Sequence, residues 1–140
     1  MKKRRFFITI LLLVCSFSMT VPAYAATNAS DQISSYFMDV VPTSNSQIAI
    51  EFSITASYKM AIIGAQAITI YEKSGSSWTY VKSFSQNDDG MTRTNAYNYG
   101  NTIYYNGKSG TEYKVYVAVF AKDSAGASDS RAEIFYVTAA

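Results

Sequence analysis

The chain has 140 residues and a formal net charge of +2 at pH 7, with 12 Lys and Arg against 10 Asp and Glu. It contains no histidine and a single cysteine, Cys15. Histidine-dependent zinc sites, Ser-His-Asp triads and Cys-His dyads are therefore excluded, because each of them needs an imidazole.

The N-terminus has the order of a secretory signal. Residues 2–5 are basic, residues 6–17 are mostly apolar, and Ala23-Tyr24-Ala25 supplies small residues at the two positions that a signal peptidase must fit. This order predicts a signal peptide at 1–25, cleaved after Ala25, and hence a secreted, extracellular protein. The apolar run is shorter than the about 20 residues that a membrane-spanning helix needs, so we expect no membrane span in the mature chain.

Cleavage would change the composition of the working chain. The basic cluster at 2–5 and Cys15 are lost, which leaves eight Lys and Arg against ten Asp and Glu, a formal charge of −2. We expect no nucleic-acid partner, because counterion release needs a basic surface that the mature chain lacks. A lipoprotein signal ending at Cys15 is the alternative, although Val14 stands where such signals carry a small residue.

Strand signals begin after a short polar segment. Residues 26–34 are small and polar, and we expect a disordered lead there. Residues 47–56 alternate strictly and predict a half-buried strand; its apolar face carries Ile48, Ile50, Phe52 and Ile54. Residues 67–72 and 77–84 are two further strands, joined by a Gly- and Ser-rich turn into a hairpin. Residues 58–67 are the one segment whose pattern allows a helical turn.

The second half of the chain continues the same pattern. Residues 85–100 are polar and rich in Asn and Asp, which favours a long loop or an edge excursion. Residues 102–105, 111–122 and 130–138 are strand candidates, the second being the longest. Its core face would carry Val115, Val117 and Val119. Short strands separated by Gly-bearing turns predict a single all-β antiparallel sandwich over residues 35–140.

Residues 110–126 (GTEYKVYVAVFAKDSAG) resemble the penultimate strand and final turn of fibronectin type III and related immunoglobulin-like domains. In those families a Gly-Thr-x-Tyr opening leads into alternating valines. The resemblance implies an immunoglobulin-like β-sandwich. It also implies that Tyr113 is buried and hydrogen-bonds backbone near the start of its strand, as in a tyrosine corner.

The whole mature chain is also similar to a group of small secreted proteins of unknown function from Gram-positive, clostridia-like bacteria. The matching features are Ile63-Gly64-Ala65, Ile70-Tyr71-Glu72-Lys73, the spacing from Gly75 to Trp78 and Val81, Gly90-Met91, Tyr105-Asn106-Gly107, Gly110 and Tyr113. This resemblance implies secretion and a β fold. It brings no activity and no site residues.

Aromatic residues are the strongest functional signal in the mature chain. Eleven of the twelve tyrosines and the only tryptophan follow Ala25. If the valines of 111–122 face the core, strand alternation places aromatic residues on the outer face of the sheet. The expected exposed patch is Tyr71, Tyr116 and Phe120, with Trp78 or Tyr80. A second candidate is the Tyr-rich segment that contains Tyr97 and Tyr99. The alternative is that these rings only reflect β propensity and pair across strands.

Tyrosine combines a flat apolar ring with a hydroxyl, which suits sugar rings and protein interfaces. We therefore expect a non-catalytic extracellular binding module whose partner is a protein or glycan on a cell surface. The alternative function is a secreted bacteriocin-like antagonistic factor, which small size and export would fit equally well. An enzyme is not expected, because no activated nucleophile or positioned acid–base pair is visible.

Asp88 and Asp89 are adjacent in an Asn-Asp-Asp-Gly segment. Such a segment is typical of a solvated turn. A weak calcium site is the alternative, since carboxylate oxygens are hard ligands, but the spacing of a calcium-binding loop is absent. We expect no metal and no cofactor otherwise.

Overall fold

The computed structural model describes residues 32–140. The predicted signal peptide with its cleavage after Ala25, Cys15, and residues 26–31 of the predicted lead lie outside the described residues. The first strand begins at Ile33, two residues inside the segment where a disordered lead was expected.

Six strands make up the described part of the chain. They are β1 (Ile33–Pro42), β2 (Gln47–Ser74), β3 (Ser77–Ser85), β4 (Thr92–Asn106), β5 (Glu112–Lys122) and β6 (Ser128–Thr138). Every pairing between them is antiparallel. The predicted all-β antiparallel class is therefore confirmed.

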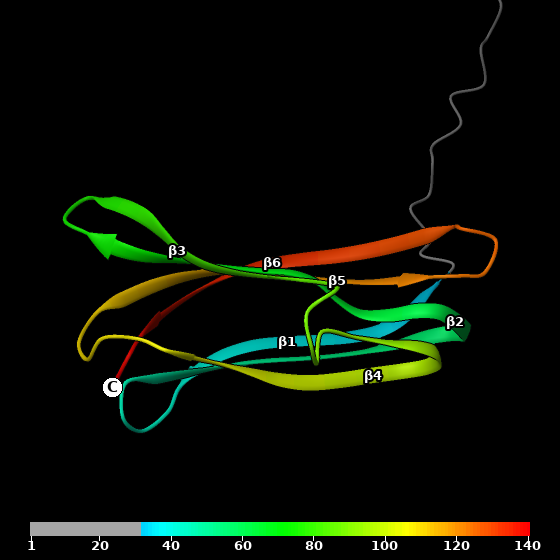
Figure 1. The fold of residues 1–140 in the computed structure, drawn as a ribbon, viewed down its shortest axis with the longest axis horizontal. Helices are drawn as coiled ribbons and strands as arrows, with labels where there is room; N and C mark the ends of the chain where they lie inside the picture. The colour runs from blue at the N-terminus through cyan, green and yellow to red at the C-terminus, as the bar shows by residue number, and fades with distance from the viewer. Residues whose placement is uncertain (1–31) are drawn as a thin grey trace, which may run out of the picture.

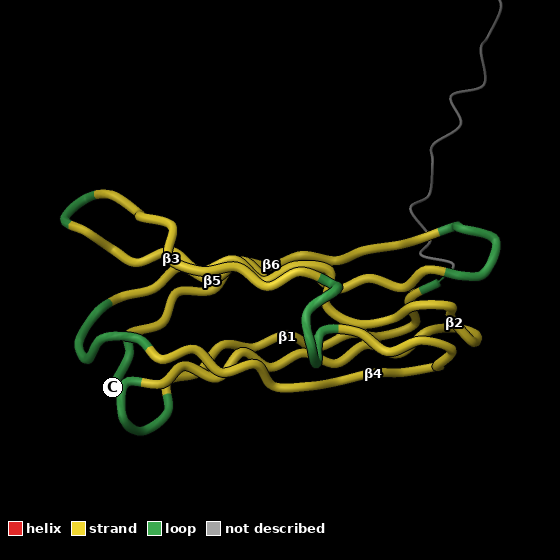
Figure 2. The backbone as a smooth tube through the Cα atoms, in the orientation of Figure 1, coloured by secondary structure: helices red, strands yellow, loops and turns green. Residues whose placement is uncertain are grey.

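The strands form one continuous, strongly curled sheet. The first half of β2 pairs with β1 and β4, and its second half pairs with β3 and β5, to which β6 is added. Figures 1 and 2 show the two halves of the sheet as facing layers. The expected sandwich of two separate sheets is not what is observed, because β2 runs from one layer into the other.

The passage between the layers lies at residues 57–66 of β2. The segment 58–67, whose pattern allowed a helical turn, contains none, because β2 is strand throughout. Ile62 and Gly64 pair with β4 on one side and with β5 on the other, so the two halves of the sheet join here. The register shifts between Thr55 and Met60 and between Ala65 and Ala67, and such irregularities let a strand bend.

Residues 92–100 belong to β4, which corrects the long loop expected at 85–100 and agrees with the alternative, an edge excursion. β4 pairs only with β2, so it is an edge strand whose outer face can carry polar residues. Its inner face packs Ala96 and Tyr99 against the core. Residues 92–100 form a strand because they pair with β2 and contact the core, even though their sequence shows little hydrophobic alternation.

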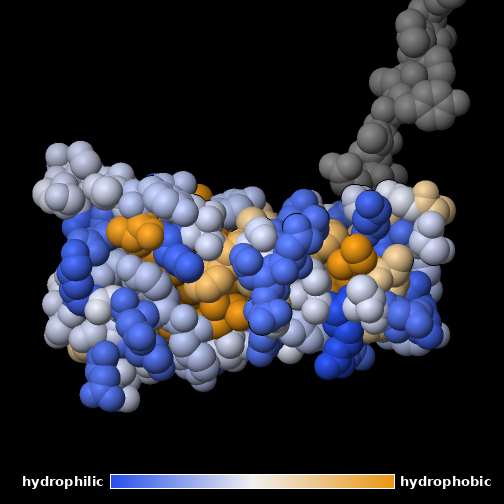
Figure 3. Space-filling view, in the orientation of Figure 1, coloured by the Kyte–Doolittle hydropathy of each residue, from blue (hydrophilic) through white to orange (hydrophobic). Residues whose placement is uncertain are grey.

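The core lies between the two layers. The predicted inward face of β2 is confirmed, since Ile48, Ile50, Phe52 and Ile54 are all buried. The inward valines of β5 are buried as well. Met91, which precedes β4, is also fully buried, and sequence patterning did not single it out. Figure 3 shows apolar atoms reaching the surface along the seam between the layers.

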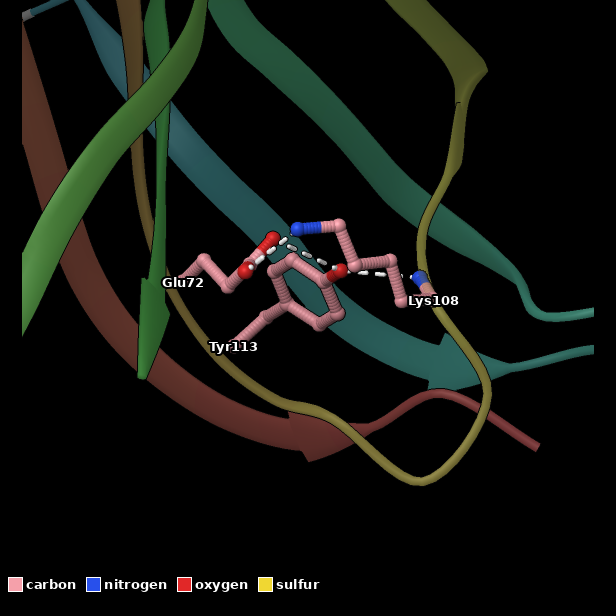
Figure 4. A network of polar contacts seen from close by, with 3 residues as sticks. All are labelled: Glu72, Lys108 and Tyr113. Carbon is pink, nitrogen blue, oxygen red and sulfur yellow. Dashed lines mark hydrogen bonds and ion pairs between the residues drawn. The ribbon is translucent and has the colours of Figure 1, made fainter. Parts of the chain in front are cut away.

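Tyr113 anchors the loop before β5 (Figure 4). It is fully buried, and its hydroxyl oxygen accepts a hydrogen bond from the backbone N–H of Lys108 at 2.8 Å. The same hydroxyl donates to Oε2 of Glu72 at 3.3 Å. Lys108 Nζ lies 2.7 Å from Oε1 of Glu72. The predicted burial and backbone hydrogen bond of Tyr113 are confirmed.

Gly64 has a φ of +148°, and a Cβ placed on it would lie 2.3 Å from the carbonyl oxygen of Met91. We expect Gly64→Ala to lower the free energy of unfolding by about 2 to 5 kcal/mol, because backbone strain and a backbone clash add. The matched control is Gly75→Ala, at a φ of +60° with nothing within 4 Å of its Cβ. It should cost only about 1 kcal/mol. Equal losses in urea unfolding would contradict a special role for the passage at Gly64.

Tyr113→Phe removes one buried hydroxyl and leaves the Lys108 N–H without its acceptor. We expect the free energy of unfolding to fall by about 1 to 2 kcal/mol. Tyr104→Phe is the control, because Tyr104 is 57% exposed on the other half of the sheet and should change stability by less than about 0.5 kcal/mol. Indistinguishable denaturation curves for the two variants would show that the Tyr113 network contributes nothing.

Burial, together with the nearby Glu72 carboxylate, raises the pKa of Tyr113 above its ordinary value of about 10, and the same causes raise the pKa of Tyr105. The folded chain then holds protons that the unfolded chain has released. The contribution of these two tyrosines to the free energy of unfolding should be constant below about pH 10. It should be lost as the pH rises through their folded pKa values. Urea unfolding between about pH 8 and 12 tests this. The fall should be shallower in Tyr113→Phe, and an equally steep fall would contradict the assignment.

Candidate ligand-binding face

The outer surface of β3, β2, β5 and β6 carries most of the aromatic residues predicted to act together. Directly opposed residues of an antiparallel pair lie on the same side of a sheet. The register therefore forms a row across four strands, consisting of Tyr80, Tyr71, Lys114 and Tyr136. The next row consists of Ser83, Thr69, Tyr116 and Ile134. We call the following set the aromatic face: Tyr71, Trp78, Tyr80, Lys114, Tyr116, Ile134 and Tyr136.

Ring contacts hold this face together. Tyr71 and Tyr80 meet edge to face, with ring centroids 6.2 Å apart and an interplanar angle of 77°. Trp78 of β3 and Tyr136 of β6 have centroids 5.6 Å apart, although β2 and β5 lie between their strands. The indole therefore reaches across the sheet, and such pairs contribute about 0.5 to 1.5 kcal/mol beyond their buried area.

Two lysines lie among the rings. Lys114 Nζ is 4.6 Å from the Tyr71 ring centroid and 5.3 Å from that of Trp78, which places the ammonium in cation–π contact with both rings. Lys73 Nζ is 5.5 Å from the Trp78 ring and also forms an ion pair with Glu112. Within residues 32–140, Lys114 has no carboxylate partner.

The outermost residues of this surface are well exposed. Tyr80 is 57%, Ile134 56% and Tyr136 61% exposed, and Tyr116 is more than one third exposed. Trp78 and Tyr71 are half-buried beneath them. In Figure 3 the surface over β3 is pale, which means that its residues are intermediate between polar and apolar. Exposed apolar side chains gathered on one face, unlike scattered ones, mark interaction surfaces.

The structure brings together three of the predicted site residues, namely Tyr71, Trp78 and Tyr116. Tyr80, which was expected as an alternative to Trp78, lies on the same face. Phe120 is different, since it is only 4% exposed and the prediction that it lies exposed on this face is wrong. Its partners in register are Gly64, which has no side chain, and Ser130, which has a small one, so neither competes with the ring for space. The alternation along β5 placed Phe120 on the correct side of the sheet. It did not predict that the ring is buried, because that burial depends on the glycine opposite it in register.

Tyr97 and Tyr99 lie on β4, in the other half of the sheet. Tyr99 packs on Phe52 with ring centroids 6.0 Å apart, and its hydroxyl donates to the carbonyl oxygen of Gly90 at 2.9 Å. It is therefore a structural residue. Tyr97 is exposed but does not belong to the aromatic face.

Sequence patterning missed Lys114, Ile134 and Tyr136 as members of the face. A signal for them was present, because 111–122 and 130–138 read as adjacent strands joined by a short turn. Pairing them as an antiparallel hairpin would have placed Ile134 beside Tyr116 and Tyr136 beside Lys114.

Asp88 closes the turn between β3 and β4. Its Oδ2 accepts a hydrogen bond from the backbone N–H of Ser85 at 2.7 Å, and its own N–H donates to the Ser85 carbonyl oxygen at 3.0 Å, which favours the turn interpretation. Asp89 lines a shallow hollow beside it. Among residues 32–140, no group of three or more acidic, His or Cys side chains is placed to hold a metal ion.

Comparisons of the chain with protein-family models, with curated proteins and with solved structures find no match. In the part of the chain that the structure describes, no helix is long and apolar enough to cross a membrane. Any function must therefore be inferred from the chemistry of the aromatic face.

Proposed function

We propose that this protein is a secreted, non-catalytic binding module whose aromatic face binds a glycan on a cell surface. Export is proposed from the signal-like order of residues 1–25. The observation that carries the binding proposal is the gathering of exposed Tyr80, Tyr116, Ile134 and Tyr136 on one sheet face.

The shape of the face supports a sugar polymer as the ligand. Four neighbouring strands make it about 14 Å wide, and both rows run straight across it. The C–H faces of a sugar ring pack on aromatic rings, while tyrosine hydroxyls can bond to sugar hydroxyls. Rings held by contacts with one another lose little conformational entropy when a ligand binds.

Charge pairing supports the non-catalytic part of the proposal. Two acidic residues that flank the aromatic face in the sequence are held in ion pairs, Glu112 with Lys73 and Glu72 with Lys108. A glycosidase needs two carboxyl groups facing each other across the sugar, one of them free to donate a proton. An arrangement of this kind does not occur on the aromatic face within residues 32–140.

The finer fold and family assignments belong to the same proposal. Tyr113 supports an immunoglobulin-like or fibronectin type III-like domain, because its buried hydroxyl bonds backbone near the start of its strand, as in a tyrosine corner. The similarity to small secreted proteins of clostridia-like bacteria supports an extracellular role. Neither assignment brings a ligand with it.

We expect Tyr80→Ser and Tyr136→Ser each to weaken glycan binding about tenfold, because a stacked ring contributes on the order of 1 to 2 kcal/mol. Binding is measured by calorimetry with glycans that a panel of soluble polysaccharides identifies. Tyr104→Ser is the matched control, since Tyr104 has the same exposed fraction as Tyr80 but lies on β4. It should bind as the wild type does.

Two outcomes would contradict the proposal. If Tyr104→Ser weakens binding while the two face variants do not, the ligand contacts the other half of the sheet. If the purified mature chain binds no glycan but inhibits the growth of related bacteria, the antagonistic factor is the better explanation.

A further inference from the structure

Lys114 occupies the centre of the aromatic face. It stands in register between Tyr71 on β2 and Tyr136 on β6, and the Trp78 ring lies over it from β3. Its Nζ contacts two rings at 4.6 and 5.3 Å. The side chain is only partly exposed, so the ammonium is surrounded by more apolar surface than a lysine in open solvent.

We infer that the aromatic face selects a sugar polymer that carries anionic groups, and that the Lys114 ammonium pairs with them. This inference rests on the proposed function and adds the charge of the ligand. The sugar ring would pack on the exposed residues Tyr116, Ile134 and Tyr136. Its anionic substituent would reach the ammonium between the rings.

Charge complementarity supports this assignment. The two rows of the face contain no acidic residue, and Lys114 is the only charged residue in them. The nearest carboxylate along β5, Glu112, is already paired with Lys73. The mature chain is acidic overall, so the positive charge of this face is a local feature and not a consequence of net charge.

The surrounding rings make an anion more favourable here than at an ordinary surface lysine. Apolar neighbours lower the local dielectric constant and reduce screening, which strengthens a charge pair. A charge-assisted hydrogen bond is also about twice as strong as a neutral one. A neutral sugar would use the rings but leave the ammonium without a counter-charge.

The test uses three forms of one polymer, namely dextran, carboxymethyl-dextran and dextran sulfate. The sugar backbone is the same in all three, so only the charge and its chemistry differ. We expect the wild type to bind at least one charged form about tenfold more tightly than dextran. The comparison of carboxymethyl-dextran with dextran sulfate shows whether carboxylate or sulfate is preferred.

Lys114→Met keeps the apolar stem of the side chain and removes its charge. It should abolish most of the preference for the charged polymers. Lys122→Met is the matched control, because Lys122 lies on the same side of the same strand, about 26 Å away, and changes the net charge equally. It should keep the preference. Thermal unfolding of both variants checks that each is folded.

The outcomes separate this inference from the proposed function. Equal binding of dextran and its charged forms by the wild type would overturn the inference and leave the glycan proposal standing. If both lysine variants lose the preference equally, the preference reflects general charge attraction. That result would overturn the inference as well. Tighter binding of poly-glutamate than of any sugar polymer would identify an acidic peptide as the ligand. No binding to any polymer, charged or neutral, here or in the polysaccharide panel, would overturn both proposals.

Discussion

The course of β2 is the constraint on which the rest of this structure depends. Its 28 residues form part of both layers and pair with four of the other five strands. The strand can pass between the layers because Gly64 adopts a φ of +148° and lets the Met91 carbonyl approach closely. That carbonyl accepts a hydrogen bond from the N–H of Ala65 at 2.7 Å, so the start of β4 is tied to the bend.

The aromatic face depends on a second anchor near the C-terminal end of β2. Glu72 lies between Tyr71 and Lys73 in the sequence and points to the other side of the sheet, where it meets Tyr113 and Lys108. Tyr113 in turn precedes Lys114 on β5. The network around the buried Tyr113 on one side of these strands therefore holds in place the backbone that presents the rings and the ammonium on the other side. This linkage orders the aromatic face without disulfide bonds in the described chain.

Local patterning predicted much of this fold because long segments bury one complete side. The alternation of 47–56 and 111–122 placed Ile50 and Val117 in the core correctly, and the turn at 73–76 predicted the hairpin of β2 and β3. Patterning failed where burial is partial. Residues 92–100 form an edge strand with a polar outer face, and residues 57–66 bend between layers, so neither shows the hydrophobic period of its final structure.

The sequence by itself determined the β class, the inward sides of the main strands, the absence of imidazole chemistry and the buried role of Tyr113. The first three follow from residue type or from spacing along a single strand, whereas the role of Tyr113 was implied by the resemblance to fibronectin type III and immunoglobulin-like domains. Only the tertiary structure decided which aromatic residues share one surface. It placed Phe120 under cover beside Gly64, left Tyr99 packed on Phe52, and set Lys114 between Tyr71 and Tyr136. The physical reason is that alternation gives the side of a strand, whereas a shared surface requires the register between strands far apart in the chain.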